Sequence, residues 1–66
     1  MELNDFGFMV RMQLLKKGKS QKWLIEEVRK STGLYLDSSY LMRILTGQRK
    51  PPKVLKAICE ILEVEN

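Results

Sequence analysis

The sequence predicts an all-α fold, a compact bundle of four helices or at most five. Three glycines, Gly18, Gly33 and Gly47, and the pair Pro51 and Pro52 divide the chain into four segments. Within each segment apolar residues recur at spacings of three and four, which is the period of a helix. No segment alternates apolar and polar residues with period two, so no strand is expected. A chain of 66 residues is long enough for one domain, and residues 1–66 are taken as that domain.

The first helix is expected to run from Asn4 or Asp5 to Lys17. Either residue can cap its start, and Gly18 is suited to its end because a left-handed residue commonly follows a helix. Its core-facing stripe is expected to contain Phe6, Val10 and Leu14, widened by Met9 and Leu15.

The second helix is expected from Ser20, a good N-cap, to about Ser31, with Gly33 ending it. Its apolar face contains Leu24, Ile25 and Val28. The single tryptophan, Trp23, is expected to cover the following turn, against Leu34 or Tyr35.

The third helix is expected to begin after Asp37 and to end near Thr46, before Gly47. Leu36 and Leu41 have the spacing of a hydrophobic staple across its start. Its inward residues are expected to be Leu41, Ile44 and Leu45.

The fourth helix is expected to run from the two prolines to about Val64, because proline is well tolerated in a first helical turn. It carries two apolar stripes. The first contains Leu55, Ile58 and Leu62 and is expected to face the core; the second contains Val54, Ala57, Ile61 and Val64. A helix that is apolar on two sides usually has a second surface to cover, so the second stripe is predicted to be the contact face of a homodimer.

The charge distribution favours a polyanionic partner. All 12 Lys and Arg residues lie between positions 11 and 56, together with three acidic residues, Glu26, Glu27 and Asp37, so twelve positive charges less three negative ones leave +9 there. The other five acidic residues lie toward the two ends. A basic middle segment suggests a surface that attracts nucleic acid, although a solvated face would have the same composition.

Several classes of protein are disfavoured by the composition. With one cysteine, Cys59, and no histidine, we expect no disulfide within the chain, no metal site, no cofactor and no enzymatic activity; Cys59 is expected in the core. No apolar run approaches the length of a membrane helix, and the acidic start does not resemble a signal peptide. The expected location is the cytoplasm.

The third helix is the predicted functional element. The side chains at its outward positions are small or able to reach base edges in a major groove. These residues are Ser38, Ser39, Met42 and Arg43. A short helix with this character, followed at once by Gln48, Arg49 and Lys50, is typical of a helix-turn-helix that reads bases and holds phosphates.

Two stretches carry a specific resemblance. GKSQKWLI at positions 18–25 and SYLMRILTGQRKP at positions 39–51 resemble the phage repressor/Cro-type (Xre-like) helix-turn-helix family, whose fold is that of lambda repressor. The resemblance covers roughly residues 8–64. It implies that the four outward residues of the third helix face bases. It also implies backbone contacts from residues near the starts or ends of the two helices: Gln21, Lys22, Thr46, Gln48, Arg49 and Lys50.

The sequence departs from the family pattern in three ways. The span from Ser20 to Tyr40 is about six residues longer than usual, and the added residues near Tyr35 either reach a DNA backbone or pad the core. Ile25 stands where the family often has alanine. No effector domain follows the fourth helix, so no small-molecule effector is expected.

The function expected from the resemblance is sequence-specific binding of double-stranded DNA by a homodimer, as a Cro-like transcriptional repressor of a phage or mobile element. Two alternatives remain open. One is an excisionase-like architectural factor that bends DNA, and the other is a protein-interaction module, such as an inhibitor or antitoxin, on the same scaffold.

Overall fold

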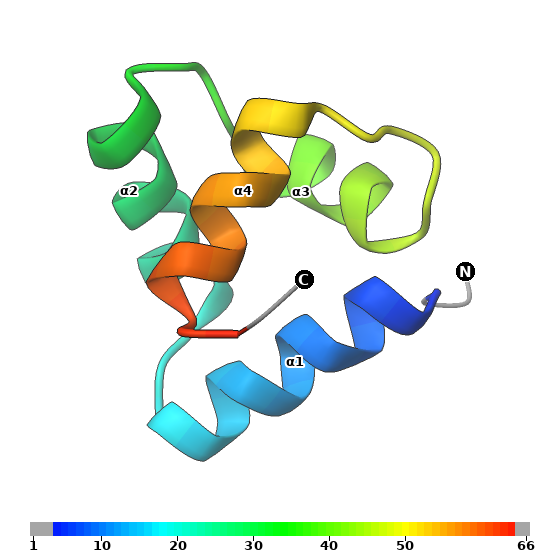
Figure 1. Cartoon of the computed structure of the whole chain (residues 1–66), viewed down its shortest axis with the longest axis vertical. Coiled ribbons are helices and arrows are strands. Elements are labelled where there is room, and N and C mark those ends of the chain that lie inside the picture. Colours follow the sequence, from blue (N-terminus) through cyan, green and yellow to red (C-terminus); the bar gives the residue numbers. More distant parts are fainter. Residues whose placement is uncertain (1–3, 65–66) are drawn as a thin grey trace.

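The computed structural model describes residues 4–64 and shows four helices and no strand within them (Figure 1). The helices are α1 (Asp5–Lys17), α2 (Gln21–Thr32), α3 (Ser38–Leu45) and α4 (Pro52–Ile61). The prediction of an all-α fold is confirmed, and no fifth helix occurs in this range.

Short-range hydrogen bonds fix where the first three helices begin. The side-chain oxygens of Asn4, Ser20 and Asp37 each accept the backbone N–H three residues ahead, at 2.8, 3.1 and 2.7 Å. These bonds satisfy N–H groups that the helix itself leaves unpaired. Gly18 and Gly33 end α1 and α2 in the left-handed conformation, with φ of 66° and 70°. The predicted starts of the first three helices and the predicted ends of α1 and α2 are therefore confirmed.

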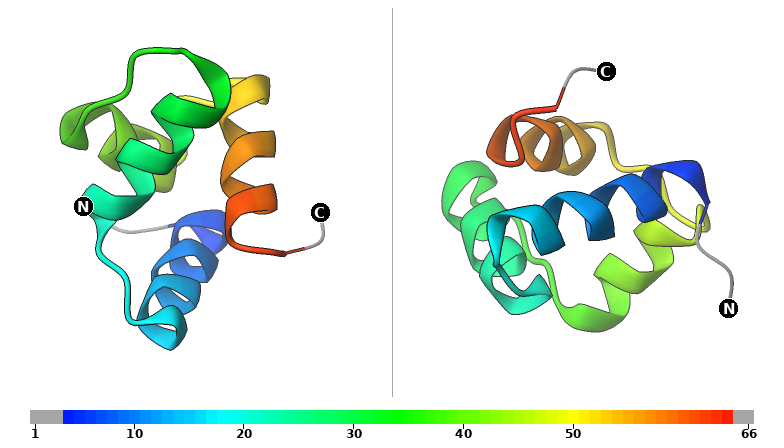
Figure 2. Two further views of the ribbon diagram at one scale, coloured as in Figure 1. Left: turned by 90° about the vertical axis from the view of Figure 1, so that its left-hand side faces the viewer. Right: turned by 90° about the horizontal axis from the view of Figure 1, so that it is seen from below.

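The core draws on all four helices. In Figure 1 the helix α4 stands against α2 and α1 runs below α3 and α4, so that α1 crosses in front of them in the view from below in Figure 2. No polar side chain is buried among the described residues, so apolar burial drives the packing. The core side chains are Val10, Leu14, Leu24, Val28, Leu36, Leu41, Ile44, Leu45, Val54, Ala57, Ile58 and Leu62.

The start of α1 lies directly on the end of α3. The Asn4 N–H donates to the carbonyl oxygen of Leu45 at 3.2 Å. Gly7, one helical turn further on, is buried, and a Cβ at this position would overlap the same carbonyl group. Only glycine allows the two backbones to come this close, so Gly7 sets the distance between α1 and the predicted reading helix.

Two of the four residues of the predicted dimer face on α4 are buried in the chain itself. Val54 and Ala57 are only 2% and 5% exposed and belong to the chain's own core, with Ile58 and Leu62. Of the remaining members of both stripes, Leu55, Ile61 and Val64 are half-buried against that core. The core-facing line of α4 passes between the two predicted stripes, so each stripe contributes residues to the core.

The fourth helix also ends earlier than predicted. It stops at Ile61, and Glu63 takes a left-handed conformation with φ of 58°. The Glu63 N–H donates to Glu60 and the Val64 N–H to Cys59, at 3.2 and 2.9 Å. These bonds close the last turn of the helix. Glycine usually occupies the left-handed position of such a turn, and here a glutamate occupies it.

Two further predictions about side chains are corrected. Leu15 was expected in the core stripe of α1 but is 75% exposed, on the same outer side of the helix as Phe8 and Met12. Trp23 was expected near the loop after α2, but it lies in the first turn of α2, at the opposite end from Leu34. There the Lys19 ammonium lies 5.5 Å from the centre of its ring. Cys59, by contrast, is buried as predicted.

Candidate nucleic-acid interface

The start of α3 is held in a fixed position by its two neighbours in sequence. Leu36 is 1% exposed and anchors the chain in the core, while Asp37 caps the helix through Tyr40. Because Leu41, Ile44 and Leu45 all face inward, the helical period turns the remaining positions outward.

Six of the predicted site residues surround one hollow of about 580 Å³ on this outer face. Four come from α3, one from the first turn of α2 and one from the turn after α3. The serines, Arg43 and Gln48 are exposed, and Gln21 and Met42 are half-buried. The lining residues are Gln21, Ser38, Ser39, Met42, Arg43 and Gln48. The structure thus brings together all four predicted base-reading residues and two of the predicted backbone contacts.

The turn after α3 is ordered by its own hydrogen bonds. The N–H groups of Gln48 and Arg49 both donate to the carbonyl of Arg43, at 2.8 and 3.3 Å. The Thr46 hydroxyl donates to Met42 at 3.0 Å and accepts from the Gln48 side chain at 3.3 Å. A hydroxyl has one proton to give, so this Thr46 geometry leaves none for a phosphate. Thr46 instead positions Gln48.

Arg43 stands between that hollow and a second one. The second hollow, of about 520 Å³, is lined by Tyr35, Asp37, Ser39, Tyr40, Arg43 and Arg49. Two guanidinium groups and two phenol rings therefore line this side of α3. Such a mixture of cations and aromatic rings suits contact with the sugar-phosphate backbone.

Asp37 is the one acidic group in the second hollow. The N–H of Tyr40 and the hydroxyl of Tyr35 both donate to its carboxylate, and these bonds hold the pKa of Asp37 below its ordinary value of 3.8. The positive charge of Arg43 acts in the same direction. The bond to Asp37 in turn raises the pKa of Tyr35 above its ordinary value of 10.0. At neutral pH the carboxylate is ionised and the phenol keeps its proton.

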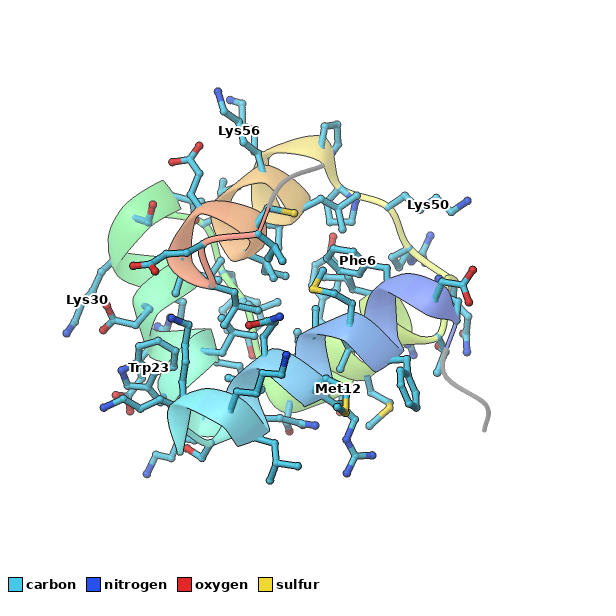
Figure 3. All side chains as sticks on the ribbon, turned by 60° about the horizontal axis from the view of Figure 1, so that its bottom comes forward. Phe6, Met12, Trp23, Lys30, Lys50 and Lys56 are labelled. Atoms are coloured by element: carbon cyan, nitrogen blue, oxygen red, sulfur yellow. The ribbon has the colours of Figure 1, made fainter. Side chains whose placement is uncertain are left out.

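The remaining predicted contacts lie around these hollows. Lys22 borders a third hollow of about 410 Å³ that also includes Gln21 and Ser38. Lys50 follows the turn and points away from the core (Figure 3). Both side chains are exposed.

Arg29 and Tyr35 border the interface, and the sequence did not predict the contact between them. The Tyr35 hydroxyl donates to Asp37 at 2.8 Å, and the Arg29 guanidinium lies 5.8 Å from the centre of the Tyr35 ring. The unusual length of the segment between Ser20 and Tyr40 pointed to this region. It did not identify Arg29, because a contact from a helix to the loop beyond it has no fixed spacing in sequence.

Residues 4–64 contain no group of three or more His, Cys, Asp or Glu side chains placed to hold a metal ion. Within the same residues, no helix has the length and apolar character needed to cross a membrane.

Comparison of the chain with known protein families, with curated proteins and with solved structures found no match.

Proposed function

We propose that this protein binds double-stranded DNA in a sequence-specific manner, with α3 in the major groove, and acts as a transcriptional regulator that occludes its operator. One observation carries the proposal: residues from α2, α3 and the following turn, all suited to DNA, converge on a single outward hollow. The net charge of +9 over residues 11–56, twelve cations less three acids, supports the same partner.

The dimensions of α3 fit this role. A helix with its side chains is about 10–12 Å in diameter, which matches the width of about 12 Å of a B-DNA major groove, and the 8 residues of α3 make it short. Arg43 can pair with guanine through two hydrogen bonds, the serines can donate to or accept from base edges, and Met42 can contact a thymine methyl group. The phosphate contacts are assigned to the polar or basic residues around α3: Gln21, Lys22, Gln48, Arg49 and Lys50.

The experiment is fluorescence anisotropy with a randomised short duplex at two salt concentrations, followed by selection from the same pool. Salt-sensitive binding with an enriched sequence is expected. An enriched inverted repeat, with half-sites about 34 Å apart, would additionally indicate a two-fold dimer. Binding without any enriched sequence would favour an architectural factor. No binding at low salt would contradict the proposal and direct attention to a protein partner.

Substitution of the two arginines separates base reading from backbone contact. Arg43→Ala is expected to cost about 1–3 kcal/mol on the selected site and to relax the preference at one position. Arg49→Ala is expected to weaken binding to all sequences alike. Lys56→Ala is the control, because Lys56 is exposed on α4 and points away from the molecule (Figure 3). An equal loss on all sequences with Arg43→Ala would remove that residue from the base-reading set.

A further inference from the structure

The loop between α2 and α3 turns its side chains outward. The sequence left two roles for the added residues, padding the core or reaching a DNA backbone. Leu36 alone enters the core, whereas Leu34 and Tyr35 are 41% and 66% exposed. Padding therefore does not explain the insertion.

The loop is nevertheless held by local bonds. The Thr32 hydroxyl donates to the Val28 carbonyl at 2.8 Å and accepts the Leu34 N–H at 3.1 Å. Gly33 allows the chain to leave the helix in a left-handed conformation and donates its N–H to Arg29 at 2.9 Å. The path of the chain into Tyr35 is fixed by these contacts.

Tyr35 is held on two sides. Its hydroxyl donates to Asp37, the residue that caps α3, and the Arg29 guanidinium lies near its ring. The ring thus has a fixed position relative to the start of the reading helix. When a guanidinium lies over an aromatic ring, its in-plane N–H groups can still donate to an anion at the edge.

The Tyr35 side chain also joins the predicted interface to the end of α2. It lines the hollow that contains Arg43 and Arg49, and it lines another that contains Arg29 and Lys30. Three acidic residues border this region, and one of them is Glu27, whose carboxylate pairs with the Lys30 ammonium at 3.5 Å. Asp37 is already hydrogen-bonded to Tyr35 and Tyr40, and Glu26 lines the hollow beside Gln21. The cations still outnumber these carboxylates, so the surface favours an anionic chain.

We propose that Arg29 and the Tyr35 ring form a second DNA-contacting element, which binds the sugar-phosphate backbone beyond the N-terminal end of α3. Arg29 donates to a phosphate and the Tyr35 ring packs against deoxyribose, while the Tyr35 proton stays on its bond to Asp37. The element lengthens the footprint on that side of each site without adding a base contact. This inference rests on the proposed DNA binding.

The test is phosphate ethylation interference on the selected duplex, combined with the salt dependence of binding. Arg29→Gln should remove interference at a phosphate flanking the site. One lost phosphate contact should also reduce the affinity loss between 50 and 200 mM salt by about 3.5-fold. Tyr35→Ala should weaken the same flanking contact, whereas Tyr35→Phe, which keeps the ring, should retain it. Lys56→Gln, with the same charge change on α4, should alter neither measurement.

The outcomes separate the two proposals. If the unmodified protein binds DNA and Arg29→Gln leaves both the interference pattern and the salt dependence unchanged, the second element is refuted and DNA binding stands. If the unmodified protein binds no DNA at low salt, both proposals fail. Circular dichroism of each variant confirms that the exposed substitutions leave the fold intact.

Discussion

At Gly7 a single hydrogen atom in place of a side chain decides how closely two helices approach. Alanine is the better helix former by about 1 kcal/mol, so propensity alone predicts that Gly7→Ala stabilises α1. The overlap with the Leu45 carbonyl acts in the opposite direction. We expect a net loss of about 1–3 kcal/mol in the free energy of unfolding, because the backbones must separate.

Urea denaturation measures this effect. Lys16→Ala is the matched control, because Lys16 is exposed on the same helix and should change stability by no more than about 0.5 kcal/mol. A stabilised Gly7→Ala variant would show that α1 can move away from α3 at little cost.

Asp37 is expected to make stability depend on pH. Its pKa is lowered in the folded chain by the bonds from Tyr40 and Tyr35. The contribution of the carboxylate is therefore complete above its ordinary pKa of 3.8 and is lost as the pH falls through the lower folded value. Asp37→Asn should destabilise the protein at pH 7 and differ much less from the original protein near pH 2.

Thermal unfolding of both proteins across this pH range provides the measurement. Ser20→Ala, which removes an uncharged cap from α2, should cost about 1 kcal/mol at either pH. If the difference between the original protein and Asp37→Asn persisted unchanged at low pH, ionisation of Asp37 would not be its source.

At the scale of elements, the end of α4 is the least favourable backbone conformation described. Glu63 is the one residue other than glycine with positive φ among residues 4–64. Its carboxylate lies 3.7 Å from the Lys17 ammonium but is 81% exposed, so the ion pair contributes little. Glu63→Gly should raise the free energy of unfolding by about 0.5–1 kcal/mol because glycine adopts this conformation without strain.

Urea denaturation of Glu63→Gly and Glu63→Gln at low salt distinguishes the backbone effect from the charge effect, because urea does not screen the ion pair. The glutamine variant loses the ion pair and keeps the strain, so it should be no more stable than the original protein. Equal stabilisation by both substitutions would place the cause in the charge.

The helices also show which features a sequence can reveal. The caps at Asn4, Ser20 and Asp37 were predictable because each acts on a backbone group three residues away. The outward face of α3 was predictable because its inward residues follow one clear period. The burial of Val54 and Ala57 was not predictable, because both sides of α4 are apolar. Only the packing of α4 within the bundle decides which side faces the core. The Gly7 contact and the Arg29–Tyr35 pair each join separate elements, so no local sequence pattern predicts them.

At the scale of the whole molecule, the apolar core makes Cys59 a probe of unfolding. The residue is 4% exposed, and burial raises the pKa of its thiol above the ordinary 9.0. Reaction with an alkylating reagent at neutral pH is therefore expected only when the chain opens. Leu41→Ala, which removes a fully buried side chain at a cost of about 2–5 kcal/mol, should accelerate the reaction at least tenfold.

Mass spectrometry of quenched samples follows the modification. Leu15→Ala is the control, because that leucine is 75% exposed and its removal should leave the rate nearly unchanged. A rate that is independent of both substitutions would mean that α4 exposes Cys59 by a local movement that does not involve the core.

The contact between the first turn of α1 and the last turn of α3 also supplies a spectroscopic reporter. The Asn4 amide proton is held by the Leu45 carbonyl, so it exchanges with solvent deuterium only when those turns separate. A ligand that steadies α3 from its outer face would slow this exchange, although Asn4 itself is not one of the proposed contacts. Occupancy of the interface would then be visible in a single amide resonance, without a label on either the ligand or the surface that binds it.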